Sequence, residues 1–392
     1  MALLRFPLRL NKVLTSPAIS TSIRSVSSLK YDGIKVSLTD NPKVIPPHDK
    51  LIFGQVFTDH MLTINWSHDD GWNTPHIVPY DHLSISPAAA CFHYAVECFE
   101  GMKAYRGVDD KIRLFRPMEN MKRLNNSARA ASLPEFDGEE FVKCLKELVR
   151  IDQKWIPAHS TKCSLYIRPT FIATEPIIGV QKCRNALLYC INCPVGPYFP
   201  KGTFNPVKLY ADPAFVRAWH GGVGESKMGG NYGPTIRVQT LAESEKNCDQ
   251  VLWLYGEDRQ LTEVGTMNIF MHWINEDGDP EIATPPLNGI ILPGVTRDSL
   301  LALGKTWGTH KISERKITMD DIKIALAEGR IKEMFGAGTA CVVCPISDIL
   351  YLNESLHIPT MENGPEVAKR FYKELTDIQY GVVEHDWTVV VD

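Results

Sequence analysis

A single lysine, Lys227, lies in the glycine-rich segment GGVGESKMGGNYGPT at residues 221–235. Clustered glycines are typical of backbone that turns sharply or approaches a ligand closely. A lysine amine can bind a phosphate as a point charge, or it can form an imine with a carbonyl compound. Lys227 is therefore a candidate phosphate ligand or covalent attachment point, and the alternative is a residue of a solvated loop.

Two nucleotide-binding motifs resemble this segment without matching it. A phosphate-binding P-loop requires GxxxxGK[ST], but Ser226 precedes Lys227 and Met228 follows it. A dinucleotide fingerprint requires GxGxxG, and GVGESK has a lysine where the third glycine belongs. GAGTAC at residues 336–341 also lacks that glycine. Both nucleotide interpretations fail, which leaves the covalent interpretation to be tested against the rest of the chain.

A lysine that carries pyridoxal phosphate as a Schiff base needs a carboxylate for the ring nitrogen, an anion site for the phosphate and donors for a substrate carboxylate. Glu263 is set between apolar residues in LTEVGTMNIF (261–270). A glutamate there has reason to face a core only if a cation awaits it. A strand-edge glutamate that faces water is the alternative.

Two further segments could bind anions. ILPGVTRDSLLAL (291–303) predicts a turn at Pro293–Gly294 and then a helix, with Thr296 as its N-cap. The free N–H groups of a helix N-terminus bind anions, and Thr266 could add a hydroxyl; otherwise, Thr296 only caps its helix. The small residues of FGAGTACVVCPI (335–346) allow successive N–H groups to form an anion-binding concavity for a substrate carboxylate.

Helices and strands that would position these groups can be predicted along the chain. Strands in hairpin-like runs mixed with helices favour an α+β fold over regular βαβ alternation. GPYFPKGTFNPV (196–207) is rich in glycine and proline and predicts a connection between two domains, residues 29–195 and 208–392. The predicted helices are 115–134, starting at Pro117, 136–155, with Phe141, Leu145 and Leu148 on one stripe, 296–303 and 319–329; the predicted strands are 51–66 (a pair), 164–172, 185–195, 207–215, 251–256 and 268–274.

The composition is that of an ordinary globular protein. Of its residues, 44% are hydrophobic and 22% are charged. The length of 392 residues predicts roughly two domains. No apolar run reaches the roughly 18 residues of a membrane span, and the formal net charge of -4 gives no indication of nucleic acid as a partner.

The first thirty residues differ from the rest of the chain. They hold five basic residues, Arg5, Arg9, Lys12, Arg24 and Lys30, many hydroxyl residues and no acid. This composition predicts a mitochondrial or plastid transit peptide over residues 1–28, and a basic tail is the alternative.

The ten cysteines are scattered and do not predict a disulfide framework. Two CxxC pairs occur, Cys190/Cys193 and Cys341/Cys344. We expect no zinc site, because the pairs are far apart and residues three apart on a strand point to opposite faces. Cys341 would be the more reactive thiol if backbone N–H groups stabilise its thiolate; two packed structural thiols are the alternative.

Taken together, these segments resemble a known family. The motifs FGQVFTDHM, FEGMKAYRG, LFRP, SLYIRP, CPVGPYFP, ADPAFVRAW, GGNYGPT, LTEVGTMNIF, TPPLNGIILPGVTR, GTACVVCP and HIPTMENGPE occur in the order found in branched-chain-amino-acid aminotransferases, most closely the mitochondrial type of animals. The resemblance implies the two-domain, pyridoxal-phosphate-dependent fold type IV (D-amino-acid-aminotransferase-like), with the cofactor between a small N-terminal and a larger C-terminal domain. It implies reversible transamination of leucine, isoleucine and valine with 2-oxoglutarate, through a Schiff base on Lys227.

The resemblance also assigns roles to individual residues. Lys227 corresponds to the catalytic, cofactor-bearing lysine. The implied cofactor contacts are Arg123, Tyr232, Glu263, Thr266, Val295, Thr296 and Thr339. The implied substrate-pocket residues are Phe53, Tyr94, Phe99, Tyr166, Arg168, Tyr198, Thr339 and Ala340.

The family further implies a homodimer, in which Tyr94 reaches into the neighbouring subunit, a location in the mitochondrial matrix, and a redox-responsive pair at Cys341 and Cys344. Docking to a 2-oxo-acid dehydrogenase complex is a further implied partnership. The alternatives are a D-amino-acid transaminase or aminodeoxychorismate lyase of the same fold, and a redox-sensing binding protein on an inactive scaffold. SLYIRP and GTACVVCP argue against the first two, and the intact Lys227, Tyr232 and Glu263 argue against the third.

Overall fold

The computed structural model describes residues 27–196, 204–362 and 364–391. Almost all of the expected transit peptide, Tyr198 and most of the expected connection at 196–207 lie outside the described residues. Within the described ranges, every helix is too short or too polar to span a bilayer.

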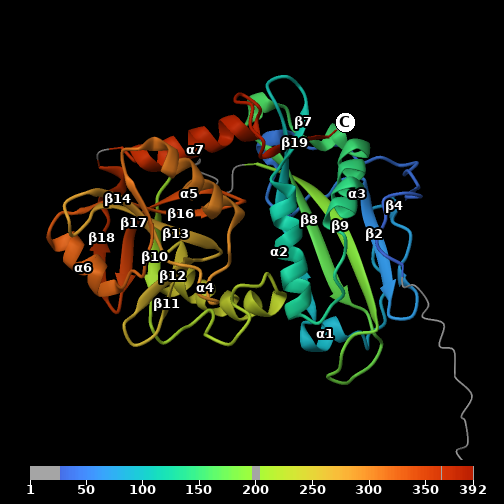
Figure 1. Ribbon diagram of the computed structural model, residues 1–392, viewed down its shortest axis with the longest axis horizontal. Coiled ribbons are helices and arrows are strands. Elements are labelled where there is room, and N and C mark those ends of the chain that lie inside the picture. Colours follow the sequence, from blue (N-terminus) through green and yellow to red (C-terminus); the bar gives the residue numbers. More distant parts are fainter. Residues whose placement is uncertain (1–26, 197–203, 363, 392) are drawn as a thin grey trace, which may run out of the picture.

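The first half of the chain builds a ten-stranded, mostly antiparallel sheet (Figure 1). The strand order is β1-β4-β2-β9-β8-β6-β7-β19, with β3 on β2 and β5 on β8. Its strands are β1 (Lys35–Val36), β2 (His60–Ser67), β3 (Gly71–Trp72), β4 (His76–Pro79), β5 (Glu97–Phe99), β6 (Met102–Arg106), β7 (Ile112–Phe115), β8 (Ser164–Ala173), β9 (Asn185–Val195) and β19 (Thr388–Val391).

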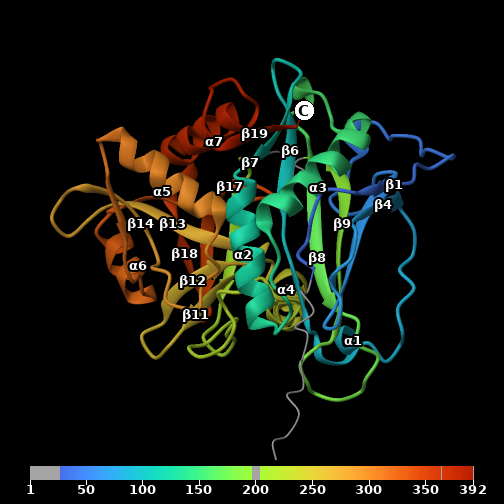
Figure 2. The same ribbon diagram turned by 45° about the vertical axis from the view of Figure 1, so that its right-hand side comes forward.

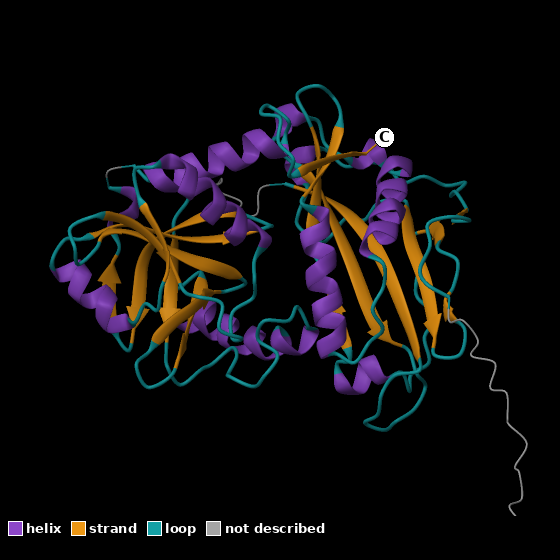
Figure 3. Cartoon of the chain, viewed as in Figure 1, coloured by secondary structure: helices purple, strands orange, loops and turns teal. Residues whose placement is uncertain are grey.

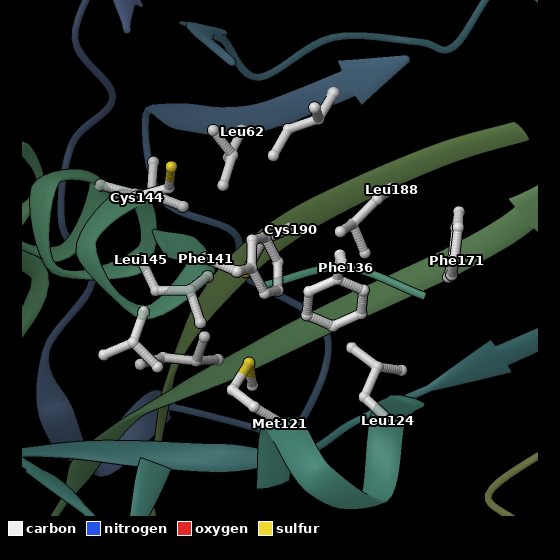
Figure 4. Close-up of a cluster of buried hydrophobic side chains, with 14 of the residues drawn as sticks. Leu62, Met121, Leu124, Phe136, Phe141, Cys144, Leu145, Phe171, Leu188 and Cys190 are labelled. Atoms are coloured by element: carbon white, nitrogen blue, oxygen red, sulfur yellow. The ribbon is translucent and has the colours of Figure 1, made fainter. Parts of the chain in front are cut away.

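Two helices, α2 (Pro117–Ala130) and α3 (Gly138–Ile151), cover one face of this sheet. A short helix, α1 (Ala90–Tyr94), precedes them in the chain and contacts β8. α2 begins at Pro117, as predicted, because proline has no N–H to lose at the start of a helix. α3 begins after Asp137, whose carboxylate accepts from two backbone N–H groups of the first turn. The predicted stripe of Phe141, Leu145 and Leu148 is fully buried against the sheet. Figure 4 shows Phe141 and Leu145 pointing from α3 toward the strands.

The second half builds a nine-stranded sheet in which β10, β11, β12, β13, β16 and β17 pair in a closed ring (Figure 3). β12 closes the ring by pairing with both β11 and β13. Leucine, isoleucine and methionine side chains from these strands fill one core cluster. The strands are β10 (Val207–Ala211), β11 (Gln250–Tyr255), β12 (Gln260–Val264), β13 (Met267–Ile274), β14 (Pro280–Thr284), β15 (Lys311–Glu314), β16 (Ile331–Gly338), β17 (Val342–Tyr351) and β18 (Glu354–His357).

Four helices pack around these strands. α4 (Gly233–Glu245) packs on β11, and α6 (Met319–Ala327) packs on β16. α5 (Val295–Trp307) and α7 (Glu366–Gln379) lie side by side on another part of the same surface, in both views (Figures 1 and 2). The predicted α+β fold with hairpin-like strand runs is confirmed.

The first sheet differs from the sequence-based expectations in two places. Residues 51–66 were expected to form a pair of strands, but only β2 is a strand there, because residues 51–59 form a loop in which Gly54 has a φ of 74°. The final strand, β19, pairs with β7 of the first sheet, so the end of the chain returns to the first half. Cys190 and Cys193 do lie on opposite faces of β9, one in the helix-covered core and the other beside Tyr166.

Candidate active site

A cavity of about 340 Å³ lies between the first sheet and the strand ring. Most residues that the sequence analysis assigned to a cofactor or substrate line it, although they come from segments far apart in the chain. The lining includes Phe53, Phe99, Arg123, Tyr166, Arg168, Lys227, Tyr232, Thr266, Val295, Thr296, Thr339, Ala340 and Cys341.

Lys227 is fixed at its backbone by the first half of the chain. Its N–H donates to the Ser127 hydroxyl of α2 at 2.8 Å, and its carbonyl accepts from the N–H of Phe99 in β5 at 3.0 Å. The side chain extends into the cavity, where Nζ donates to the Tyr232 hydroxyl at 3.0 Å and lies 4.8 Å from the centre of the Phe99 ring. The amine is therefore held between a hydroxyl and an aromatic face.

One glycine of this segment has a steric reason to be glycine. Gly229 follows Lys227 by two residues, and a Cβ on it would collide with the carboxylate of Glu97. The close approach lets the chain turn directly into the short helix Gly229–Asn231 and then α4, which places Tyr232 beside the lysine.

One end of the cavity is positively charged. Arg123 of α2 is 7% exposed and donates from Nε and Nη2 to both oxygens of Glu100, at 2.7 and 2.8 Å. Asn120 also donates to Glu100, and Arg123 Nη1 donates to the Pro293 carbonyl. Burial alone would raise the pKa of Glu100, but the charge and hydrogen bonds of Arg123 outweigh it and hold that pKa below its ordinary value. The guanidinium is thus oriented before any ligand arrives.

The N-terminus of α5 lies at the same end. Its N-cap is Gly294, with no side-chain cap, so the expected capping role of Thr296 is wrong. Thr296 is the second helical residue, because the chain is still extended at Gly294 (φ -70°, ψ 131°). A Cβ at Gly294 would collide with Asn268, whose amide holds the Leu292 carbonyl at 2.9 Å. The uncapped N–H groups of this turn are available to an anion.

Glu263 lies in β12 and is 2% exposed. One oxygen accepts from the Leu292 N–H at 2.6 Å, and the other pairs with Arg217 Nε at 3.1 Å. Arg217 is the cation that the apolar setting of Glu263 required. Burial raises the pKa of Glu263, and the charge of Arg217 counteracts that rise. Two carboxylate oxygens offer about four acceptor positions, so the pair leaves room for one more donor.

The opposite end of the cavity is aromatic with one guanidinium. Arg168 of β8 donates from Nη2 to the Tyr166 hydroxyl at 3.2 Å, and its guanidinium carbon lies 4.8 Å from the centre of the Phe99 ring. Phe53 packs edge-on against Tyr166 with ring centres 4.9 Å apart. Arg168 Nε is buried and has no hydrogen-bond partner among the described residues. This wall can contact an aliphatic group and still offers one donor to an anion.

A tight turn between β16 and β17 forms a third wall. Thr339, Ala340 and Cys341 line the cavity, and Val342 has a φ of 66°, which is rare for a β-branched residue. Burial raises the pKa of Cys341 to about 12 and raises that of Cys344 further. The condition for a reactive Cys341, a stabilised thiolate, is therefore not met in this arrangement.

The structure does not bring every predicted residue to the cavity. Tyr94 is 38% exposed on α1 and does not line the cavity of its own chain; Tyr198 lies outside the described residues. Cys344 is fully buried, and Glu263 does not line the cavity; its carboxylate accepts from the N–H of Leu292, which does. In the described ranges no cluster of three metal-ligating side chains occurs.

The sequence reasoning missed Glu100, Lys103 and Arg217, which are buried and charged and touch the site or its walls. One signal was available for the first two. They interrupt the otherwise apolar run CFEGMKAY (98–105), where a charged side chain needs a partner.

The residues present fit pyridoxal 5′-phosphate. The uncapped α5 N-terminus, Arg123 and the hydroxyls of Thr266, Thr296 and Thr339 form a donor set suited to a phosphate. The amine of Lys227 lies in the same cavity with Tyr232 beside it, and the buried acid Glu263 binds the N–H of Leu292 in the cavity wall.

Comparisons with known proteins agree with this fit. The model of the family Amino-transferase class IV matches residues 97–349. The chain is 61% identical over 344 residues to the cytosolic branched-chain-amino-acid aminotransferase of Mus musculus, covering 88% of this chain and 89% of that one. It is 54% identical over 366 residues to the mitochondrial enzyme of Rattus norvegicus, covering 93% of each.

A solved structure shows the same fold. The branched-chain aminotransferase of Thermoproteus uzoniensis with norvaline superimposes with a TM-score of 0.66 at 23% identity, covering 84% of this chain and 99% of that one.

Proposed function

The chain belongs to the class IV aminotransferases and, among them, to the branched-chain-amino-acid aminotransferases, and from this premise we propose that it reversibly transfers the amino group of leucine, isoleucine and valine to 2-oxoglutarate. Its cofactor is pyridoxal 5′-phosphate. The observation that carries the proposal is the amine of Lys227, held 3.0 Å from the Tyr232 hydroxyl in a cavity with a cationic end and an aromatic end.

The residues around the cavity would hold the cofactor at four points. Lys227 would hold it covalently through Nζ, Tyr232 would donate to its phenolic oxygen, and Glu263 would pair with its ring nitrogen. The phosphate would lie at the α5 N-terminus, on Arg123, Thr266, Val295, Thr296 and Thr339. When bound, the cofactor supplies an electron sink for the α-carbon of the amino acid.

Lys227 would then act as the base. Once a substrate amine has displaced Lys227, the free Nζ would take the proton from the substrate α-carbon. The same Nζ would then deliver a proton to the C4′ carbon of the cofactor. The Tyr232 hydroxyl and the Phe99 ring keep Nζ in place for this transfer. The carboxylate of Glu263 is paired with Arg217, whose charge counteracts the rise in the pKa of Glu263 that burial causes.

Two kinds of side chain must bind in one pocket. Phe53, Phe99 and Tyr166 offer aromatic surface to a branched aliphatic chain. Arg168 lines the cavity, so its guanidinium would offer a donor to the second carboxylate of glutamate or 2-oxoglutarate. The N–H groups of Thr339 and Ala340 would bind the carboxylate that every substrate shares.

We expect Arg168→Gln to weaken the binding of 2-oxoglutarate much more than that of leucine. The KM for 2-oxoglutarate should rise roughly 10- to 100-fold, because a hydrogen bond to a charged group contributes about 1.5–3 kcal/mol. The KM for leucine should change much less. Steady-state kinetics with each substrate varied measures this, and Arg184→Gln, which removes an exposed partner of Asp69, is the control. Equal losses for both substrates would assign Arg168 to general packing instead.

An absorption experiment tests the function as a whole. The purified protein saturated with pyridoxal 5′-phosphate should show a visible band that moves to shorter wavelength with L-leucine and returns with 2-oxoglutarate. A band that responds to D-leucine instead would indicate a D-amino-acid transaminase. A band that ignores both would refute the substrate assignment and leave the fold assignment intact.

We also propose that the protein forms a homodimer in which Tyr94 enters the pocket of the partner subunit. Supporting this, large apolar side chains are exposed on and near α1 and α4, which lie along the same edge of the molecule in Figures 1 and 2. They include Phe92 (63%), Ile178 (72%), Trp219 (58%) and Ile236 (66%). Sedimentation equilibrium decides the matter, and a monomer at micromolar concentration would rule the dimer out.

The proposed location is the mitochondrial matrix, on the evidence of residues 1–28. The close relatives include both mitochondrial and cytosolic enzymes. Import and cleavage of a reporter fused to this segment tests the location.

Docking to a 2-oxo-acid dehydrogenase complex is a further proposed interaction of the enzyme, and co-sedimentation with that complex tests it.

We also propose that oxidation of Cys341 and Cys344 disturbs the turn at Thr339–Cys341, because Cys341 lines the cavity. Burial keeps both thiols protonated at neutral pH, so the reaction should be slow. Activity that survives complete oxidation of both thiols would refute it.

A further inference from the structure

Lys103 of β6 is a buried lysine with no role in the function proposed above. It is 7% exposed. Its strand neighbours Met102 and Ala104 pack into the helix-covered core, so the lysine side chain leaves the sheet on the opposite face. There its Nζ donates to the carbonyl of Ala340 at 2.8 Å, across 237 positions of sequence. The first sheet thus holds the middle residue of the turn that lines the cavity.

The ammonium has no acidic partner. Among the described residues Lys103 forms no ion pair, and the ionisable groups around it are the thiols of Cys341, Cys163 and Cys193, with Tyr166 directly opposite on β8. A buried ammonium is costly unless it is paired. Burial accordingly lowers the pKa of Lys103 to about 8, and the thiols only partly offset this. Such a charge is stabilised by any anion that binds nearby.

The lysine stands behind the turn as seen from the cavity. Thr339, Ala340 and Cys341 line the cavity, whereas Lys103 lines a separate void of about 10 Å³ with Thr296, Thr339 and Val342. In a planar trans peptide the C=O and the next N–H point in opposite directions. Holding the Ala340 carbonyl toward Lys103 therefore turns the Cys341 N–H away from the lysine, toward the cavity side.

We propose that Lys103 is a positioning residue for the substrate carboxylate: it holds the Ala340 carbonyl so that the turn presents the Cys341 N–H to the cavity, next to the N–H groups of Thr339 and Ala340, and its unpaired positive charge attracts the carboxylate through the turn. The proposal rests on the function proposed above, since it deepens the account of how that site binds its substrates. The strained φ of Val342 is consistent with a turn that its surroundings hold in place.

Carboxylate binding should then be coupled to the proton on Lys103. A bound anion raises the pKa of a nearby ammonium, so the carboxylate binds more tightly when Lys103 is protonated. The affinity for the carboxylate should be highest below pH 8. It should fall as the pH rises through the pKa that Lys103 has in the ligand-free protein. A neutral ligand of the same shape should show no such fall.

The test uses the holoenzyme with two probes, 4-methylpentanoate, which is leucine without its amino group, and the uncharged 4-methylpentanamide. Dissociation constants are measured by calorimetry from pH 6.5 to 9.5 for the wild type and for Lys103→Met and Lys103→Gln. The methionine removes charge and donor, and the glutamine keeps a donor. Lys332→Met is the matched control, because Lys332 also donates from Nζ to a backbone carbonyl, that of Gly329, but is exposed and far from the cavity.

In the wild type the preference for the carboxylate over the amide should fall roughly tenfold across this range, the size that one pKa unit of coupling gives. Both Lys103 variants should lose that preference at pH 7 and show no pH dependence, with KM for leucine rising more than kcat falls. A pH-independent preference in the wild type overturns the proposal, even if neither variant folds. Variants that are only less heat-stable, with unchanged preference, also overturn it. A wild type that binds neither probe and leaves leucine untouched instead refutes the proposed function.

Discussion

Lys227→Ala should reduce transamination of leucine by at least about 10⁴-fold, the upper part of the range that a positioned acid–base group contributes. The variant loses both the covalent attachment through Nζ and the base that moves the α-proton. The fold should persist, because Lys227 is anchored by its backbone, through Ser127 and Phe99, and neither bond uses the side chain.

The measurement is the initial rate with leucine and 2-oxoglutarate, together with the visible band of the cofactor. Borohydride reduction followed by peptide mapping should label residue 227 in the wild type and nothing at that position in the variant. Lys246→Ala is the control, because its amine also lies over a tyrosine ring, that of Tyr210 at 5.8 Å, but outside the cavity. A variant that keeps a tenth of the wild-type rate would show that Lys227 is not the base.

The parts of this site that the sequence predicted are those encoded locally. Lys227 and Tyr232 are five residues apart in one glycine-rich segment, and a single turn brings them within 3.0 Å. Pro117 marks the start of α2 because its effect on a helix depends only on its own backbone. Motif reasoning therefore located the amine, its hydroxyl partner and the helix α2, from which Arg123 lines the cavity.

The parts that the sequence did not predict depend on packing between distant segments. Arg217 pairs with Glu263 over 46 positions, and Lys103 reaches Ala340 over 237. Nothing within either segment specifies its partner, because the first contact forms only when the loop after β10 packs against β12, and the second only when the first sheet meets the strand ring. The cap of α5 was predicted wrongly for a related reason: a threonine near a helix start is a good cap, but the helix begins two residues earlier than expected, after the extended Gly294, which Asn268 of β13 approaches closely.

A second large effect is expected at Glu100, which no motif singled out. Glu100 is fully buried, and its two oxygens accept from Arg123 Nε and Nη2, from Asn120 and from the Gly101 N–H. Glu100→Gln keeps the shape but leaves Arg123, which cannot lose its proton, as an unpaired buried cation. We expect the free energy of unfolding of the cofactor-free protein to fall by about 3–5 kcal/mol, the usual cost of removing one partner from a buried ion pair.

The same argument predicts how the cofactor and pH change this loss. A phosphate dianion at the α5 N-terminus would restore a negative charge beside Arg123, so the loss should be smaller in the holoenzyme. Arg123 outweighs burial and holds the pKa of Glu100 below its ordinary value, so its contribution to stability is present at neutral pH and disappears as the pH falls through that lowered pKa. The difference between wild type and variant should therefore shrink in acid.

Chemical denaturation at pH 7 and near pH 4, with and without pyridoxal 5′-phosphate, measures all three expectations. Glu135→Gln provides the matched control, because Glu135 also binds an arginine of α2, Arg129, through Nε and Nη2, but on the surface. Water screens that pair, and its removal should leave the unfolding free energy nearly unchanged. If Glu100→Gln behaved like Glu135→Gln, burial of Arg123 would not depend on its acid, and the oriented cationic end of the cavity would need another explanation.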